Sequence, residues 1–337
     1  MKKILVAHSL ILTFIAGYLV WRDLLKPAEH DNPGQVREIV LSYGVPVLDL
    51  PAQLDFAGER VPLEDPEVRE RLDRELHVNA YWHSNTIFLL KRGARWLPEI
   101  GRILAENDIP DDFKYLAVIE SDLLNKVSPS QAVGFWQLLR GTARDYGLEV
   151  GEEVDERYHP LKSTAAAAKY LKNARNRFGT WTNAAAAYNM GVRGLQNSIA
   201  RQGMKSYYDL LLNEETSRYL FRVLAIKLIF ENPGQYGFHP ETDQLYSREK
   251  TRQVTLTRSI PDLRDFSFRE GINYKILKRH NPWLRKNSLN VRSGRSYVVD
   301  IPLSPVEHPD NRLTEADSAM LEPDSLATEE HMRRQEE

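Results

Sequence analysis

The stretch DFKYLAVIESDLL, from Asp112 to Leu124, places one carboxylate on an otherwise apolar helical face. On a helix of about 3.6 residues per turn, the neighbours of Glu120 three, four and seven positions away are all apolar. These neighbours are Phe113, Leu116, Ala117, Leu123 and Leu124. Because burial disfavours the charged form of a carboxyl group, Glu120 must be paired, protonated or used in chemistry. From this stretch alone, a structural ion pair and a catalytic role are both open.

The composition of the chain excludes several classes of function. The 337 residues are 42% apolar and 27% charged, which is typical of a globular protein with one large core or two domains. The net charge of −2, with Lys and Arg spread along the chain, provides no basic field for nucleic acid. The absence of Cys excludes disulfides, thiolate metal sites and a lipid-modified N-terminal Cys. With no P-loop, dinucleotide fingerprint or His-Glu-x-x-His motif, we expect neither a cofactor nor a metal site.

The N-terminal residues 1–25 read as a signal peptide or a signal anchor. Lys2 and Lys3 precede a largely apolar run from Ile4 to Val20, followed by Trp21. The length of the run fits either kind of segment. The lack of a small-x-small cleavage site and the interfacial Trp21 favour an uncleaved anchor. We therefore expect a protein of the periplasm or cell envelope that is tethered to the membrane.

Three segments follow, and the chain is predicted to be mainly α. Residues 26–64 are broken by Pro and Gly and are expected to form an extended approach segment draped over the next domain. Residues 65–235 carry helical patterns, beginning with the cap signal of Asp65 and Pro66. Runs of four alanines beginning at Ala165 and Ala184 predict helices that approach their neighbours closely.

The C-terminal part changes character. Residues 250–303 read as strand, helix, helix, strand, with β-rich ends at Val254–Thr257 and Tyr297–Ile301, and are expected to form a small separate α+β module. Residues 309–337 are strongly acidic and poor in apolar residues, so we expect a disordered tail.

Two further motifs lie downstream of Glu120. In SPSQAVGFWQLL, Gly134 allows a close backbone approach, and Trp136 and Gln137 pair an indole with an amide, a combination suited to sugar recognition. The alternative for Trp136 is a place in the core. In AAAAYNMG, Tyr188 and Asn189 end a helix of small residues, where they either face a cleft or cap the helix.

The combination IES, AVGFWQ, AAYNMG and ETSRYL, in this order, resembles the lytic transglycosylases with a lysozyme-like domain, particularly the membrane-bound type D class. The resemblance extends from FAGERVPL near Phe56 to NPWL near Trp283. It implies that Glu120 is the single catalytic carboxylate. It also implies substrate-binding roles for Ser128, Trp136, Gln137, Tyr188, Asn189 and Tyr219. One departure is Arg140, which stands where the family usually has Pro.

The resemblance further implies cleavage of the β-1,4 bond between N-acetylmuramic acid and N-acetylglucosamine in peptidoglycan, with a 1,6-anhydro product. Glu120 would act first as the acid and then as the base, with no second carboxylate, unlike ordinary glycosidases. A hydrolytic muramidase is the enzymatic alternative, and its second carboxylate would come from the acidic run Glu152–Glu156. A non-catalytic peptidoglycan-binding envelope protein is the other alternative.

Residues 254–301 resemble a degenerate LysM module, a β-α-α-β unit that binds N-acetylglucosamine chains. The chain has RSIPDL where the family has a Gly-Asp-Thr-Leu start. Glycan binding and a purely structural role are both open for this module.

Overall fold

The computed structural model describes residues 47–304. The predicted signal segment at residues 1–25 and the predicted acidic tail at residues 309–337 lie outside the described residues. Within residues 47–304, every helix is too short or too polar to cross a bilayer.

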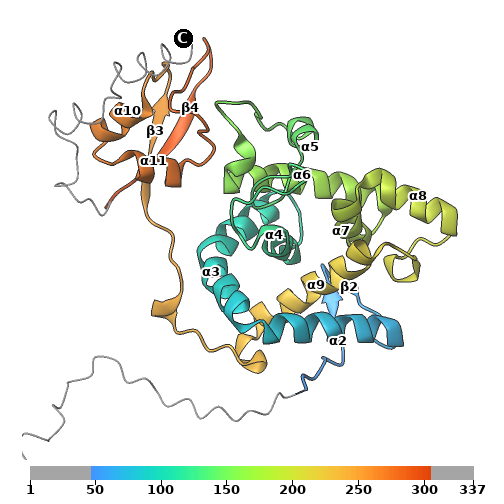
Figure 1. Ribbon diagram of the computed structural model, residues 1–337. Coiled ribbons are helices and arrows are strands. Elements are labelled where there is room, and N and C mark those ends of the chain that lie inside the picture. Colours follow the sequence, from blue (N-terminus) through green and yellow to red (C-terminus); the bar gives the residue numbers. More distant parts are fainter. Residues whose placement is uncertain (1–46, 305–337) are drawn as a thin grey trace, which may run out of the picture. The chain divides into compact units, whose positions relative to one another are not determined.

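Helices dominate the first and larger part of the described chain, and the prediction of a mainly α fold is confirmed (Figure 1). The α-helices are α2 (Pro66–Tyr81), α3 (His83–Glu106), α4 (Lys114–Ser121), α5 (Arg140–Asp145), α6 (Pro160–Phe178), α7 (Trp181–Met190), α8 (Val192–Gln202) and α9 (Glu214–Glu231). Short 3-10 turns join them at Asp111–Phe113, Glu156–Tyr158, Tyr207–Asp209, Pro233–Tyr236 and Thr242–Gln244. The side chain of Asp65 accepts a hydrogen bond from the Glu67 amide at the start of α2, as the sequence predicts.

The short helix α4 lies within a ring of longer helices (Figure 1) and packs against α3 and α9. The alanine runs lie in α6 and α7, which pack against each other. Ala167, Ala168 and Ala184 have no exposed surface, since small side chains let the two backbones approach closely. This packing fixes the elements that surround the end of α4.

The segment before α2 contains a short β-hairpin that packs against the helices. A hairpin of β1 (Asp55–Phe56) and β2 (Glu59–Arg60) places the ring of Phe56 in the helical core with no exposed surface. The carboxylate of Glu59 accepts hydrogen bonds from the Trp181 and Thr182 amides at the start of α7. An anion at a helix N-terminus satisfies free amides and the helix dipole. Residues 55–60 therefore pack against the helical domain, and the boundary at residue 65 stays a prediction.

The C-terminal module has the predicted β-α-α-β order. Its elements are β3 (Thr251–Leu256), α10 (Leu263–Arg269), α11 (Tyr274–His280) and β4 (Tyr297–Pro302). The two strands pair antiparallel, from Thr251 opposite Pro302 to Leu256 opposite Tyr297. A separate cluster of buried side chains, including Leu263, Trp283 and Val299, forms the core of the module.

A buried ion pair connects α9 to the 3-10 turn just before α4. The ammonium group of Lys227 in α9 lies 2.7 Å from a carboxylate oxygen of Asp112, just before α4, and both side chains are largely buried. The same Asp112 oxygen accepts a hydrogen bond from the Ala57 amide. Removing one member of such a pair leaves an uncompensated charge.

We predict that Lys227→Met lowers the free energy of unfolding by about 3 kcal/mol, because the charge of Asp112 loses its partner. Urea denaturation of purified protein measures this change. The control is Lys172→Met, which breaks a pair with Asp108 whose side chains are 49% and 83% exposed. The control should cost less than about 1 kcal/mol. Equal losses in the two variants would contradict the structural role of Lys227.

Candidate active site

Helix α4 ends directly after Glu120. Asp122 and Leu123 both have left-handed backbones, with φ of 57° and 56°, so the chain leaves the helix after Ser121. The prediction of a helical face continuing through Leu124 is therefore wrong, and Leu124 is 42% exposed. Ending the helix at this point places Glu120 on its last turn, partly open to solvent.

The carboxyl group of Glu120 has an unusual electrostatic environment. Burial raises the pKa of Glu120 to about 7. The hydroxyl of Tyr219 donates a hydrogen bond to a Glu120 oxygen at 2.7 Å, which lowers the pKa, as does the positive charge of Arg222. Arg222 itself donates to the carbonyl oxygen of Ile119. With a neutral hydroxyl as its partner, Glu120 is poised between its protonated and charged forms near neutral pH, and the ion-pair interpretation is not supported.

The loop that follows, residues 122–138, has a strained backbone. Four of its residues other than glycine have left-handed φ values: Asp122, Leu123, Gln131 and Gln137. Each such conformation costs about 1–3 kcal/mol and persists only where the surroundings impose it. Gly134 has φ of +83°, and an added Cβ would lie 2.0 Å from the carbonyl oxygen of Arg157. The loop must therefore be held by its neighbours.

Side chains from the motifs form some of the hydrogen bonds that fix the backbone of this loop. The buried hydroxyl of Ser121 donates to the carbonyl oxygen of Phe135 at 2.9 Å. The hydroxyl of Tyr188 in α7 donates to the carbonyl oxygen of Trp136 at 2.6 Å. Three of the predicted motifs, IES, AVGFWQ and AAYNMG, are thus brought together, and each of the two contacts runs from a side chain to the loop backbone.

The indole of Trp136 is buried. It has no exposed surface, and its Nε1 donates to the Thr164 hydroxyl at 2.8 Å. The expected sugar-binding face of Trp136 is therefore contradicted, and the alternative place in the core is correct. Burying the large apolar ring is favourable because its one polar group keeps a partner.

Gln137 and Ser128 lie on the loop with their side chains partly exposed. The Gln137 amide donates to the carbonyl oxygens of Lys126 and Gly134 at 3.1 and 2.8 Å. The Ser128 hydroxyl accepts from the Ala132 amide. Both side chains therefore close the loop on itself, and contact with a glycan stays a prediction for each.

Glu215, to which the sequence motifs assign no role, acts on the charge state of Glu120. The negative charge of Glu215, an exposed side chain at the start of α9, raises the pKa of Glu120 further. The amide group of Asn189 donates to the Glu215 carboxylate at 3.1 Å and accepts from the Thr216 hydroxyl at 2.8 Å. The available signal was the spacing of four residues from Glu215 to Tyr219, which puts both on one helical face.

The acidic run Glu152–Glu156, which is the predicted source of a second carboxylate, forms ion pairs and hydrogen bonds with residues other than Glu120. Asp155 pairs with Arg157, and Glu156 pairs with Lys162. Glu152 pairs with Lys286, and the carboxylate of Glu153 accepts from the amide of Asn290. Within residues 47–304, no cluster of three or more His, Asp or Glu side chains could hold a metal ion.

Two neighbours shift the pKa of Glu120 in opposite directions: the Tyr219 hydroxyl lowers it and the charge of Glu215 raises it. Substitution of each neighbour tests these effects. Tyr219→Phe removes a donor that stabilises the carboxylate, so the pKa should rise. Glu215→Gln removes a neighbouring negative charge, so the pKa should fall. Carbon-13 NMR titration of labelled glutamate carboxyl groups measures both changes, with the signal assigned through Glu120→Gln. Glu214→Gln is the matched control and should leave the pKa unchanged; a fall in Tyr219→Phe would contradict this description.

Two family models match the chain. Residues 101–211 match the transglycosylase SLT domain, and residues 252–305 match the soluble lytic transglycosylase C-terminal LysM-like domain. The first match covers Glu120, the loop and the Tyr188 motif. These matches confirm the resemblance identified from the sequence motifs.

Curated relatives agree with the family models. The chain is 28% identical to membrane-bound lytic murein transglycosylase D of Escherichia coli (strain K12) over 254 residues, covering 72% of this chain and 54% of that protein. The protein of the same name from Escherichia coli O6:H1 gives the same figures. A putative tributyltin chloride resistance protein of Alteromonas sp. (strain M-1) is 30% identical over 114 residues, covering 32% of this chain and 55% of that protein.

The chain spans about half the length of the curated relatives that it matches. By its family matches, the chain carries a transglycosylase SLT domain followed by a LysM-like domain of the lytic transglycosylase type.

Proposed function

We propose that this protein is a peptidoglycan lytic transglycosylase that cleaves the β-1,4 bond between N-acetylmuramic acid and N-acetylglucosamine and leaves a 1,6-anhydro end. The observation that carries the proposal is Glu120, whose pKa of about 7 is set by burial within the segment that matches the SLT domain. A carboxyl group that keeps its proton near neutral pH is suited to general acid catalysis.

In the proposed reaction, Glu120 donates its proton to the glycosidic oxygen while the bond from that oxygen to C1 of the muramic residue breaks. The resulting carboxylate accepts the proton of the muramic C6 hydroxyl, whose oxygen forms the new bond to C1. Glu120 thereby returns to its protonated state without a second carboxylate. Tyr219 supports the charged form through its hydrogen bond of 2.7 Å, and burial supports the neutral form. These two effects keep both protonation states accessible in one turnover.

Hydrolysis by a muramidase is the second candidate, and Glu215 is the observation that favours it. Its exposed carboxylate lies close enough to affect the pKa of Glu120 and could activate water. The Glu215 carboxylate already accepts a hydrogen bond from Asn189. Attack by the C6 hydroxyl needs no such base, and for this reason transglycosylation is the leading proposal.

The proposed substrate implies a location in the cell envelope. Peptidoglycan glycan strands are the proposed partner of both the SLT domain and the LysM-like module. One relative is named as a membrane-bound enzyme. Tethering through the apolar run Ile4–Val20 stays a prediction, because that run lies outside the described residues.

Glu120→Gln keeps the shape of the side chain but can neither deliver nor accept the proton. Release of soluble glycan fragments from purified sacculi should fall by about 10² to 10⁴-fold, the usual contribution of a general acid-base group. The matched control is Glu106→Gln, an exposed position on α3, which should retain full activity. Full activity in Glu120→Gln would remove Glu120 from the mechanism.

The products of the wild-type protein separate the two candidate reactions. Intramolecular attack should give 1,6-anhydro ends, lighter than hydrolytic ends by one water, about 18 mass units. Mass spectrometry of the released fragments measures this difference. Reducing muramic ends as the main product would support the muramidase, and Glu215→Gln should then abolish their formation.

A further inference from the structure

Residues 149–157 connect α5 to α6 and contact the LysM-like module through their backbone. The Asp155 amide donates to the carbonyl oxygen of Trp283 at 3.0 Å, and the Arg285 amide donates to the carbonyl oxygen of Glu153 at 2.7 Å. Val154 between them is 3% exposed and belongs to the buried cluster of the module. The part of the segment around Val154 is thus packed against the module, while Val150 belongs to the core of the helical domain.

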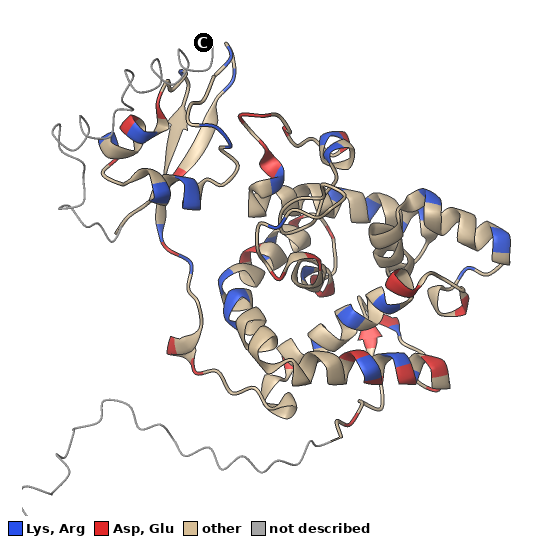
Figure 2. Cartoon of the chain, in the orientation of Figure 1, with Lys and Arg blue, Asp and Glu red and all other residues tan. Residues whose placement is uncertain are grey.

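Exposed charged contacts also join the segment to the module. Acidic side chains are concentrated along the segment (Figure 2). The carboxylate of Glu149 accepts from Arg295 at 3.0 Å and from the hydroxyl of Tyr297, and Glu152 pairs with Lys286 at 2.8 Å. These pairs join one acidic segment to basic and polar groups of the module.

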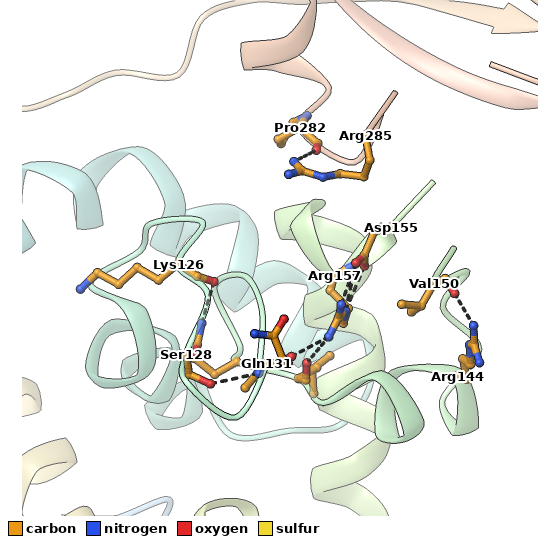
Figure 3. A network of polar contacts seen from close by, with 12 residues as sticks. Lys126, Ser128, Gln131, Arg144, Val150, Asp155, Arg157, Pro282 and Arg285 are labelled. Carbon is orange, nitrogen blue, oxygen red and sulfur yellow. Dashed lines mark hydrogen bonds and ion pairs between the residues drawn. The ribbon is translucent and has the colours of Figure 1, made fainter. Parts of the chain in front are cut away.

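The other end of the segment holds the loop that follows Glu120. The guanidinium of Arg157, only 5% exposed, donates to both carboxylate oxygens of Asp155 (Figure 3). One of its nitrogens also donates to the carbonyl oxygens of Gln131 and Leu138 at 3.0 and 3.2 Å. A single side chain therefore binds both ends of the 131–138 turn. Gly134 adds a close backbone contact with the Arg157 carbonyl oxygen, which leaves no room for a Cβ.

We infer that the LysM-like module braces the loop beside Glu120 through Asp155 and Arg157, and that Arg157 is a positioning residue for the site. The chain of contacts is continuous, from Trp283 to Asp155, from Asp155 to Arg157, and from Arg157 to both ends of the turn. The inference rests on the proposed function only in that the braced loop carries Ser128 and Gln137, the predicted glycan contacts.

The physical need for the brace lies in the backbone of the turn. Gln131 and Gln137 have φ of 62° and 44°, backbone conformations that residues other than glycine rarely adopt. The carbonyl oxygen of Leu138 is buried and accepts from the Val133 amide as well as from Arg157, and the same Arg157 nitrogen donates to the carbonyl oxygen of Gln131. A guanidinium has five donors in a fixed plane and can serve a carboxylate and two carbonyls together, whereas an ammonium group has three donors and no such fork.

The direct test is hydrogen exchange on the full chain without substrate. Arg157→Lys keeps a cation beside Asp155 but removes the fork, so amides within 126–138 should exchange about tenfold faster. Arg144→Lys is the matched control, since Arg144 donates to the carbonyl oxygen of Val150 and makes no contact with the turn. Unchanged exchange within 126–138 in Arg157→Lys would overturn the role of Arg157.

The module side is tested separately with Val154→Asp, which puts a carboxylate into the module's core and leaves Arg157 in place. Faster exchange in both 149–157 and 126–138 is the expected result. Faster exchange in 149–157 alone would refute the coupling between the module and the turn.

Kinetics on soluble glycan fragments provide the third measurement. Arg157→Lys should raise KM about tenfold with a smaller change in kcat, because the turn that carries the binding groups is displaced while Glu120 is not. The basic limb of the pH profile should stay where it is in the wild type. Equal losses in kcat for Arg157→Lys and Arg144→Lys with no change in KM would contradict positioning. The exchange measurement requires no turnover, so the brace and the proposed function can fail independently.

Discussion

The carbonyl oxygens of the loop after Glu120 impose the constraint on which the site depends. A loop with four left-handed residues other than glycine does not hold its shape through local preference. It is held because side chains from distant elements donate to its carbonyls, among them Ser121, Tyr188 and Arg157. Each donor satisfies a backbone acceptor of the loop, so losing one of these hydrogen bonds also removes a constraint that maintains the strained backbone.

This constraint explains why several motif residues contact backbone. Tyr188 and Gln137 each donate to loop carbonyls, and the indole of Trp136 is fully buried. The residue types of these motifs predict direct contact with a sugar, yet the hydrogen bonds of Tyr188 and Gln137 go to the loop backbone. Glu120 and Tyr219 differ from these residues because their side chains contact each other directly, through a hydrogen bond of 2.7 Å between α4 and α9.

The sequence predicts the regular parts of the fold well. The cap at Asp65, the alanine helices and the strands near residues 251 and 297 follow from local patterns that the structure contains. The end of α4 was missed, because no local signal marks a left-handed Leu123, and tertiary contacts override its preference. The burial of Trp136 and the contacts of Arg157 depend on residues far along the chain, which spacing within a motif does not reveal.

The raised pKa of Glu120 affects the stability of the folded protein. A pKa near 7 in place of 4.5 corresponds to about 3 kcal/mol of differential interaction, set mainly by burial. Between those two values the folded state binds more protons than the unfolded chain, so this group lowers stability as pH rises through that window. The helical core and buried pairs such as Lys227 with Asp112 must offset this cost and the strain of the loop. A carboxyl group held between its two protonation states therefore requires a rigid surrounding structure, and the strained loop beside Glu120 requires the same rigidity.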